Sequence, residues 1–189
     1  MTGKTHRIFG ITAGLSYYFA TTVHQYSPAT FGAVVVGSYF GSLLPDIDQP
    51  VSDIWDSLPF GHTIGKVPGA LLRHRHLSHS LLGLIVFNFL IFLILQTFPS
   101  YWGIDTTVVL TVMVISYASH LLADSFTVEG IPILYPWHRN FGIPPKPLEG
   151  IRIQTGEWFE NLIIFPIINI ALIVLVFGNW DNIKTILLK

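Results

Sequence analysis

The chain contains no cysteine and few charged residues: only 11% of its 189 residues are Asp, Glu, Lys or Arg. Without cysteine, disulfide bonds and thiolate metal sites are excluded, so any bound metal must use nitrogen and oxygen ligands. The formal net charge is −1, which argues against a nucleic-acid-binding protein, since such proteins carry a basic surface. No polar stretch is long enough to separate two domains, so we predict one domain over residues 1–189.

What the chain has in abundance is apolar residues, which make up 51% of the sequence and give a mean hydropathy of +0.57. A water-soluble domain of this length rarely carries so many. The uncharged run Leu81–Phe98 is close to the length needed to cross ~30 Å of hydrocarbon. The sequence therefore indicates that a membrane is the natural solvent of this chain.

Four further segments are predicted to span the membrane: Thr106–Leu122, Leu162–Phe177, Ile8–Val23 and Ala29–Leu44. The last two are short and rich in small residues, which suit close helix–helix packing. Their alternative is a buried hairpin that never meets lipid. We thus expect an all-α, polytopic membrane protein of about five transmembrane helices with interfacial loops.

The distribution of Lys and Arg predicts the orientation, because positive residues near helix ends stay in the cytoplasm. The short loops 25–28 and 99–105 contain none. Only Lys184 and Lys189 fall on the same side as these loops. The N-terminal tail and the long loops, roughly 45–77 and 123–160, hold the others: Lys4, Arg7, Lys66, Arg73, Arg75, Arg139, Lys146 and Arg152. We expect the N-terminus in the cytoplasm.

Side chains that bind metals lie at the same end of every predicted helix. His120 and Asp124 are four residues apart, which places them on one helical face within reach of a single ion. Pro45 and Pro50 keep the run around Asp46 and Asp48 from forming a regular helix. The full set on this face is His6, Asp46, Asp48, His74, His76, His79, His120, Asp124, Glu157 and Glu160.

Each of these residues also has an ordinary interpretation. His120 and Asp124 could be a hydrogen-bonded pair at a helix end, and Asp46 and Asp48 could be solvated turn residues. His74 and His76 could extend to the lipid surface beside Arg73 and Arg75. These readings do not explain why all the residues share one membrane face, while the opposite face offers only His24, Asp105 and Asp181. The convergence favours a site.

The ligand types limit the metal and its number. Imidazole with carboxylate suits Zn, Mn or Fe, whereas an all-oxygen set would favour Mg or Ca. More than four ligand candidates indicates more than one ion. Spacing does not choose the histidines, since His76 and His79 are three residues apart and His74 and His79 five. If Ser78 caps the third helix, His79 is its first residue.

The chain resembles the YdjM-like family of bacterial inner-membrane proteins, often described as membrane-bound metal-dependent hydrolases. The resemblance rests on Thr5-His6, Leu44–Asp48, His74–Ser80, Ser119–Asp124, Thr127–Pro136 and Gly156–Glu160. It implies that His74 and His79 are the paired histidines and that Glu160, rather than Glu157, belongs to the site. It also implies a multi-pass inner-membrane location. A fainter likeness to zinc-dependent phospholipase C rests on the His-x-x-x-Asp pair.

The expected function is hydrolysis, an activity that comes from the resemblance. Its metal ligands would be His6, Asp46, Asp48, His74, His79, His120, Asp124 and Glu160, holding one to three divalent ions with Zn first among the candidates. Asp46, Asp48 or Glu160 is the candidate base, and Arg75 the group that holds an anionic substrate. The interfacial location suits membrane lipids and lipid-like phosphoesters as partners, with no nucleic acid.

The alternative function is structural metal binding or ion transport. Transport predicts ionisable groups near the bilayer midplane. The centres of the predicted helices offer only Asn88 and Asn169. An interfacial site therefore fits the sequence better.

Overall fold

A computed structural model describes residues 1–21, 27–49, 52, 55, 77–99, 102–137 and 139–188 of the chain. Within these ranges the fold is all-helical, with six α-helices and no strand. Two isolated bridges, Thr127–Ile153 and Ile131–Phe141, connect parts of the long segment before the last helices. The predicted fold class is confirmed.

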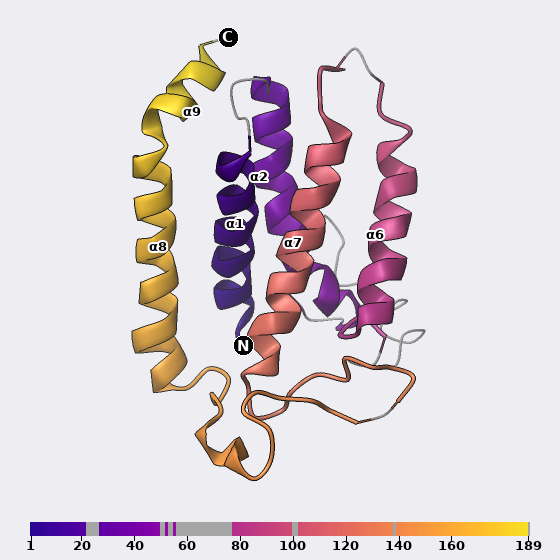
Figure 1. Ribbon diagram of the computed structural model, residues 1–189, viewed down its shortest axis with the longest axis vertical. Helices are drawn as coiled ribbons and strands as arrows, with labels where there is room; N and C mark the ends of the chain where they lie inside the picture. The colour runs from indigo at the N-terminus through magenta and orange to yellow at the C-terminus, as the bar shows by residue number, and fades with distance from the viewer. Residues whose placement is uncertain are drawn as a thin grey trace.

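The helices stand side by side in one layered bundle (Figure 1). Helices α1 (Gly3–Ala20), α2 (Pro28–Leu43) and α7 (Thr106–Ser125) pack against one another at the centre. Helix α6 (Leu81–Leu95) packs on α7 at one edge, and α8 (Phe165–Gly178) packs on α1 at the other. The short helix α9 (Trp180–Leu187) follows at the end remote from the N-terminus (Figure 1).

Polar caps set the starts of three helices. Ser27 Oγ accepts a hydrogen bond from Thr30 N at the start of α2, and Ser80 Oγ accepts one from Gly83 N at the start of α6. Asp105 accepts bonds from the backbone of α7. These side chains satisfy amide groups that have no partner inside a helix. Ser80, not Ser78, is therefore the cap of α6, and His79 lies on the turn before the helix.

Small residues allow the central helices to approach closely. A Cβ added at Gly10 of α1 would lie 2.2 Å from Ser42 Cβ of α2. One added at Gly41 would lie 2.9 Å from the backbone oxygen of Met113 in α7. Such contacts leave no room for larger side chains, as is common between membrane helices. The small residues that we expected to serve helix packing are found doing so in α1 and α2.

The number of helices able to cross a membrane is lower than the five expected. In the described residues, three helical segments are long and apolar enough to cross a membrane: Pro28–Asp48, Thr106–Ser125 and Glu160–Gly178. The segment predicted as Leu81–Phe98 forms a helix only over Leu81–Leu95, because the chain turns before Pro99, which disfavours helix at the residue before it. Helix α1 begins with polar residues that include Lys4 and Arg7, which lowers its hydropathy.

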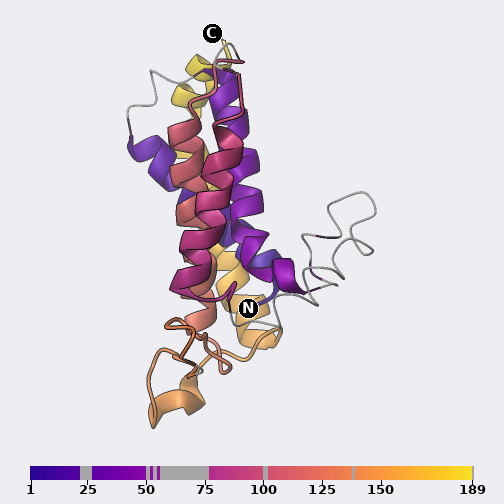
Figure 2. The ribbon, with the colours of Figure 1, turned by 90° about the vertical axis from the view of Figure 1, so that its right-hand side faces the viewer.

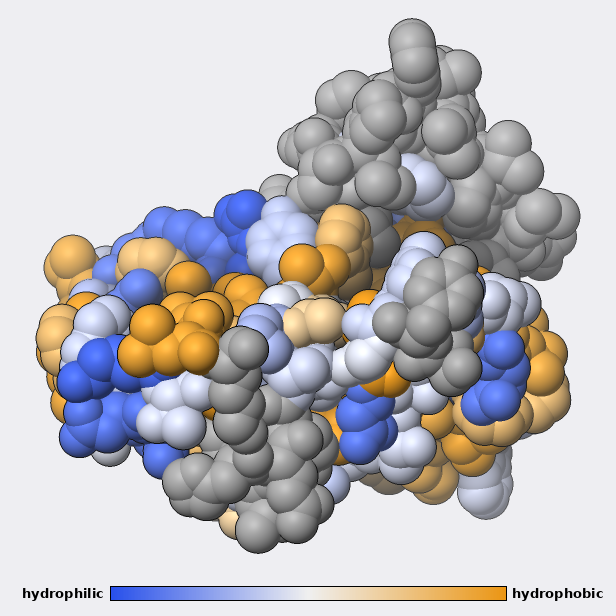
Figure 3. Space-filling model, turned by 90° about the horizontal axis from the view of Figure 1, so that it is seen from above, coloured by the Kyte–Doolittle hydropathy of each residue, from blue (hydrophilic) through white to orange (hydrophobic). Residues whose placement is uncertain are grey.

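The two outer helices expose apolar faces that suit lipid. On α8, Ile167, Ile173 and Phe177 are 59%, 54% and 72% exposed. On α6, which faces the viewer in Figure 2, Ile85 and Phe89 are likewise exposed. Large apolar surfaces of this kind mark a membrane or partner interface in a folded protein. Figure 3, looking onto the α9 end, shows hydrophobic and hydrophilic surface side by side, as expected where helix ends meet the polar interface.

The other end of the bundle gathers the segments that carry the predicted ligands. The N-terminus, the start of α6 and the end of α7 all lie toward this end (Figures 1 and 2). The 3-10 helix η2 (Leu44–Asp48) follows α2 there, and the π-helical turn η5 (Glu160–Ile164) precedes α8. The antiparallel order of the helices therefore brings residues from the whole chain to one end.

Candidate metal centre

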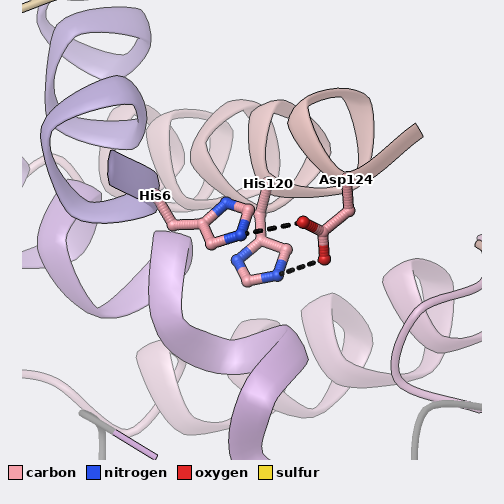
Figure 4. A group of neighbouring side chains, drawn as sticks. All are labelled: His6, His120 and Asp124. Atoms are coloured by element: carbon pink, nitrogen blue, oxygen red, sulfur yellow. Dashed lines mark ion pairs between the residues drawn. The ribbon is translucent and has the colours of Figure 1, made fainter. Parts of the chain in front are cut away.

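Three side chains from two helices form the first cluster, shown in Figure 4. His120 and Asp124 lie one turn apart on α7, with His120 Nε2 3.5 Å from Asp124 Oδ2. His6, in the first turns of α1, stacks its ring on that of His120 at a centroid distance of 3.6 Å. Its Nε2 lies 3.0 Å from Asp124 Oδ1. The spacing of four residues on α7 thus places both side chains in one cluster, as predicted.

A second cluster shares His120 and adds residues from two other segments. Asp46 comes from η2 and His79 from the turn before α6. His79 Nε2 lies 3.6 Å from Asp46 Oδ1 and 3.5 Å from Asp124 Oδ2. His120 Nε2 lies 3.9 Å from Asp46 Oδ1. Two imidazole nitrogens and two carboxylate oxygens therefore converge.

These separations fit a bound ion better than hydrogen bonds. Distances of 3.5–3.9 Å are longer than an N–H···O hydrogen bond. Nε2 of His79 and Nε2 of His120 are buried and have no hydrogen-bond partner within the described residues. A regular tetrahedron with edges equal to these four nitrogen–oxygen distances would have its centre roughly 2.1–2.4 Å from each corner, near the Zn–N and Zn–O bond lengths of about 2.0–2.2 Å. The clusters have the residues and the spacing to hold a metal ion.

The carboxyl groups at this end of the bundle also favour a bound cation. His6, His79, His120, Asp48 and Asp124 are all buried. Asp46, Asp48 and Asp124 bring three carboxyl groups to this end of the bundle, and the α-amino group of Met1 pairs with Asp124 Oδ1. Burying carboxylates without a compensating cation costs several kcal/mol per ion. The Met1 ammonium offsets part of that cost at Asp124, and a divalent cation beside Asp46 and Asp124 would offset more of it.

Neighbouring groups orient the two histidines of the second cluster. His120 Nδ1 lies 2.6 Å from the Ser42 carbonyl, which accepts its hydrogen and leaves Nε2 as the ligand atom. Tyr117 Oη donates to the Ser78 carbonyl at 2.5 Å and so holds the turn that carries His79. The sequence did not predict these roles of Ser42 and Tyr117. Tyr117 could have been recognised as a neighbour of the site, because it lies three residues before His120 on the same face of α7.

Asp48 lies beside the clusters but outside both of them. Its side chain is fully buried, and Oδ2 accepts a hydrogen bond of 3.0 Å from Ser78 Oγ. The same Ser78 hydroxyl lies 3.2 Å from His79 Nδ1. Asp48 thereby connects to a cluster histidine through one hydroxyl group. Its prediction as a ligand or base remains a prediction.

Glu160 occupies a different position from the other predicted ligands. Its Oε1 accepts hydrogen bonds of 2.6–2.7 Å from the Thr2 amide, the Thr2 hydroxyl and the Thr5 hydroxyl. Its Oε2 accepts one of 2.8 Å from Gly156 N. The fully buried carboxylate joins the segment before α8 to the turn that leads into His6. In this arrangement Glu160 positions the N-terminal turn, and its role as a ligand is a prediction that these contacts do not support.

We expect Glu160→Gln to lower the free energy of unfolding by about 1–3 kcal/mol, because an amide cannot accept all four of these hydrogen bonds and places N–H groups opposite donors. The melting temperature in detergent would measure the loss. Glu157→Gln is the matched control, since Glu157 is exposed and lies only three residues earlier. Equal melting temperatures for the two variants would contradict the positioning role.

The remaining predicted site residues lie outside the described part of the chain. They are His74, Arg75 and His76. The structure thus brings together His6, Asp46, His79, His120 and Asp124, with Asp48 adjacent and Glu160 behind the N-terminal turn.

Fold and site together define a helical membrane protein with buried His–Asp clusters that can hold a metal ion. The sequence profile of the YdjM inner membrane protein family matches residues 1–183. The chain therefore belongs to the YdjM inner membrane protein family, and the resemblance seen in its motifs is confirmed. Family membership and the apolar helices support an inner-membrane location.

Individual relatives agree with this assignment. The chain is 33% identical to the uncharacterized protein YvsG of Bacillus subtilis over 167 residues, covering 87% of this chain and 88% of the relative. It is 32% identical over 148 residues to the inner membrane protein YdjM of Escherichia coli, covering 76% of this chain and 70% of the relative. The YdjM protein of Shigella flexneri matches equally well. No solved structure matches the chain.

Proposed function

We propose that this protein is a membrane-bound metal-dependent hydrolase that cleaves a phosphoester of a lipid or another amphiphile at the cytoplasmic face of the membrane. The observation that carries the proposal is the convergence of His79 Nε2, His120 Nε2, Asp46 Oδ1 and Asp124 Oδ2 at 3.5–3.9 Å. A hydrolytic site needs such a set next to a surface that its substrate can reach. This set lies at one end of a bundle whose outer helices α6 and α8 expose apolar side chains, which supports a substrate from the membrane.

The residues divide into separate roles. Asp46, His79, His120 and Asp124 would hold one ion, with Zn the leading candidate and Mn or Fe the others. His6, with Nε2 3.0 Å from Asp124 Oδ1, would provide a further ligand. A divalent ion in such a site supplies a bound water with a pKa near neutrality and stabilises charge on a phosphoryl oxygen.

Other groups would act on the water and the substrate. Asp48, held by Ser78, is the candidate base for the attacking water. Arg75 is the candidate for binding the substrate's anionic group, because a guanidinium can donate two parallel hydrogen bonds to phosphate. Glu160 would keep His6 in place through Thr2 and Thr5.

The alternative of ion transport finds little support in the helix centres. Asn88 Nδ2 donates to the Leu84 carbonyl and Asn169 Nδ2 to the Phe165 carbonyl, each at 2.7 Å and each within its own helix. Both amide nitrogens are thus bonded within their own helices, and the two side chains line no common polar path, since α6 and α8 lie at opposite edges of the bundle (Figure 1). A structural metal remains the second candidate function.

The test is release of phosphate or a phosphorylated headgroup from a lipid panel in mixed micelles. The metal-loaded protein should cleave at least one lipid, and chelation should abolish cleavage. Arg75→Ala should lower turnover about 100-fold at unchanged metal content, because it removes charge stabilisation and no ligand. Arg139→Ala, an exposed arginine of the other long loop, is the control. If the fully metallated wild type cleaves no ester in the panel, the structural role is the better explanation.

A further inference from the structure

An apolar groove runs along the outer side of the bundle beside the metal clusters. Its walls are α6, α7 and the chain between residues 131 and 145, and its volume is about 500 Å³. Leu84, Ala118, Leu122, Ile133 and Phe141 are among the side chains that line it. Its one hydroxyl side chain, Ser125, donates to the Leu122 carbonyl. The lining therefore offers contacts suited to hydrocarbon and little to a polar ligand.

The groove lies on the opposite side of α7 from the metal ligands. Ala118 and Leu122 are each two residues from His120, which at about 100° per residue places them on the far face of the helix. His120 and Asp124 point inward, where they are buried, whereas Ala118 and Leu122 are exposed. A molecule in the groove would therefore be separate from one bound at the metal clusters.

The groove opens onto the surface that faces lipid. Leu81 lines it and is itself 46% exposed, and the exposed side chains of Ile85 and Phe89 continue along α6 from that point. This chain belongs to an inner-membrane family, and the exposed apolar side chains of α6 suit hydrocarbon as the medium beside it. The lining and the open side fit an acyl chain from the adjacent leaflet.

A cationic side chain contacts the loop wall of the groove from outside its lining. The Arg152 guanidinium donates to the Pro144 carbonyl at 2.8 Å, to the Gly142 carbonyl at 3.2 Å and to the Val128 carbonyl at 3.5 Å. Gly142 lines the groove, and a Cβ added there would lie 2.5 Å from Arg152 Cζ. Because a guanidinium has five N–H donors, these three bonds leave two N–H groups for a phosphate. Apolar walls and a positive charge at one wall match the two parts of a phospholipid.

We propose that this groove is a binding site for a membrane phospholipid, with one acyl chain between α6, α7 and the 131–145 segment and the lipid phosphate at Arg152. The bound lipid would attach this segment to the bilayer beside the metal clusters. The proposal depends on the groove alone and stands whether or not the clusters are hydrolytic.

Photo-crosslinking tests the proposal. The probe is phosphatidylglycerol with a diazirine on one acyl chain, in phosphatidylcholine vesicles that contain the purified full chain. Crosslinks mapped by mass spectrometry should concentrate in residues 118–125 and 131–145. Ala118→Trp, which fills the groove from an exposed position, should lower these crosslinks at least fivefold. Ala171→Trp, at an exposed position of α8, is the matched control and should leave them unchanged.

A second pair of variants tests the proposed contact between Arg152 and the lipid phosphate. Arg152→Gln should weaken groove labelling by phosphatidylglycerol but not by a diazirine diacylglycerol, which lacks the phosphate. Lys146→Gln, an exposed cation of the same segment, is the control. Melting temperature and metal content should match the wild type in Ala118→Trp, so that lost labelling reports lost binding. Wild-type crosslinks spread evenly over α6 and α8 would overturn the proposal even without a variant.

Discussion

Asp124→Asn is expected to lower metal affinity by at least about 100-fold. Losing a residue that only hydrogen-bonds to a ligand costs up to about 100-fold, and losing the ligand itself should cost at least as much. The two oxygens of Asp124 face three histidines, His6 on one side and His79 and His120 on the other. Replacing it removes a charge that every proposed ion would use. Metal analysis of the purified protein and titration with Zn, Mn and Fe would measure the change.

The melting temperature should also show the loss of bound metal. An ion present at 100 times its Kd stabilises the folded state by about 2.7 kcal/mol. Chelation should therefore lower the melting temperature of the wild type clearly and that of Asp124→Asn little. Asp181→Asn, an exposed aspartate at the opposite end of the bundle, is the control and should respond like the wild type.

If the cluster binds no metal, a different result is expected. If His6, His120 and Asp124 were only hydrogen-bonded partners, Asp124→Asn would destabilise the protein equally with and without chelator. A wild type that is metal-free and melts unchanged after saturation with Zn, Mn and Fe would contradict the metal centre.

Single cysteines at Thr107 and Gln154 are expected to react with an impermeant maleimide from opposite sides of the membrane. Both positions are exposed, Thr107 at the start of α7 and Gln154 in the segment that precedes α8, at the opposite end of the bundle (Figure 1). The excess of Lys and Arg on the cluster side predicts that Gln154→Cys stays unlabelled in intact cells and that Thr107→Cys is labelled fully. Since the natural chain has no cysteine, background labelling should be absent.

Permeabilised cells provide the control, because both cysteines should then react. Labelling of both positions in intact cells would contradict the multi-pass topology. Labelling of Gln154→Cys alone would reverse the orientation and move the proposed site away from the cytoplasm.

Much of the site could be predicted from local features of the sequence. His120 and Asp124 fall on one face of a helix by their spacing, and Pro45 forces the Asp46–Asp48 run out of regular α-helix. The alternation of apolar segments placed His6 and His79 at the same end as these residues. Each of these inferences depends on a short stretch of chain or on the up-and-down order of the helices.

Other assignments depended on contacts that no local pattern contains. Glu160 was expected to bind metal, and that role stays a prediction; the structure shows its carboxylate accepting hydrogen bonds from Thr2, Thr5 and Gly156. Local spacing left open whether Ser78 caps α6; in the structure Ser80 takes that role and leaves His79 on a turn. The spans were also overcounted, because hydropathy does not show where a helix stops within an apolar run, as at Leu95.

The sequence by itself determined the class of this protein, its solvent and the end of the bundle where its polar residues collect, because composition, apolar run length and spacing act locally. Only the tertiary structure decided which atoms meet: that Asp124 joins three histidines, that the Ser42 carbonyl orients His120, and that Glu160 holds the N-terminal turn. These contacts join residues up to 158 positions apart. Their geometry follows from how closely the small residues of α1, α2 and α7 let the helices approach.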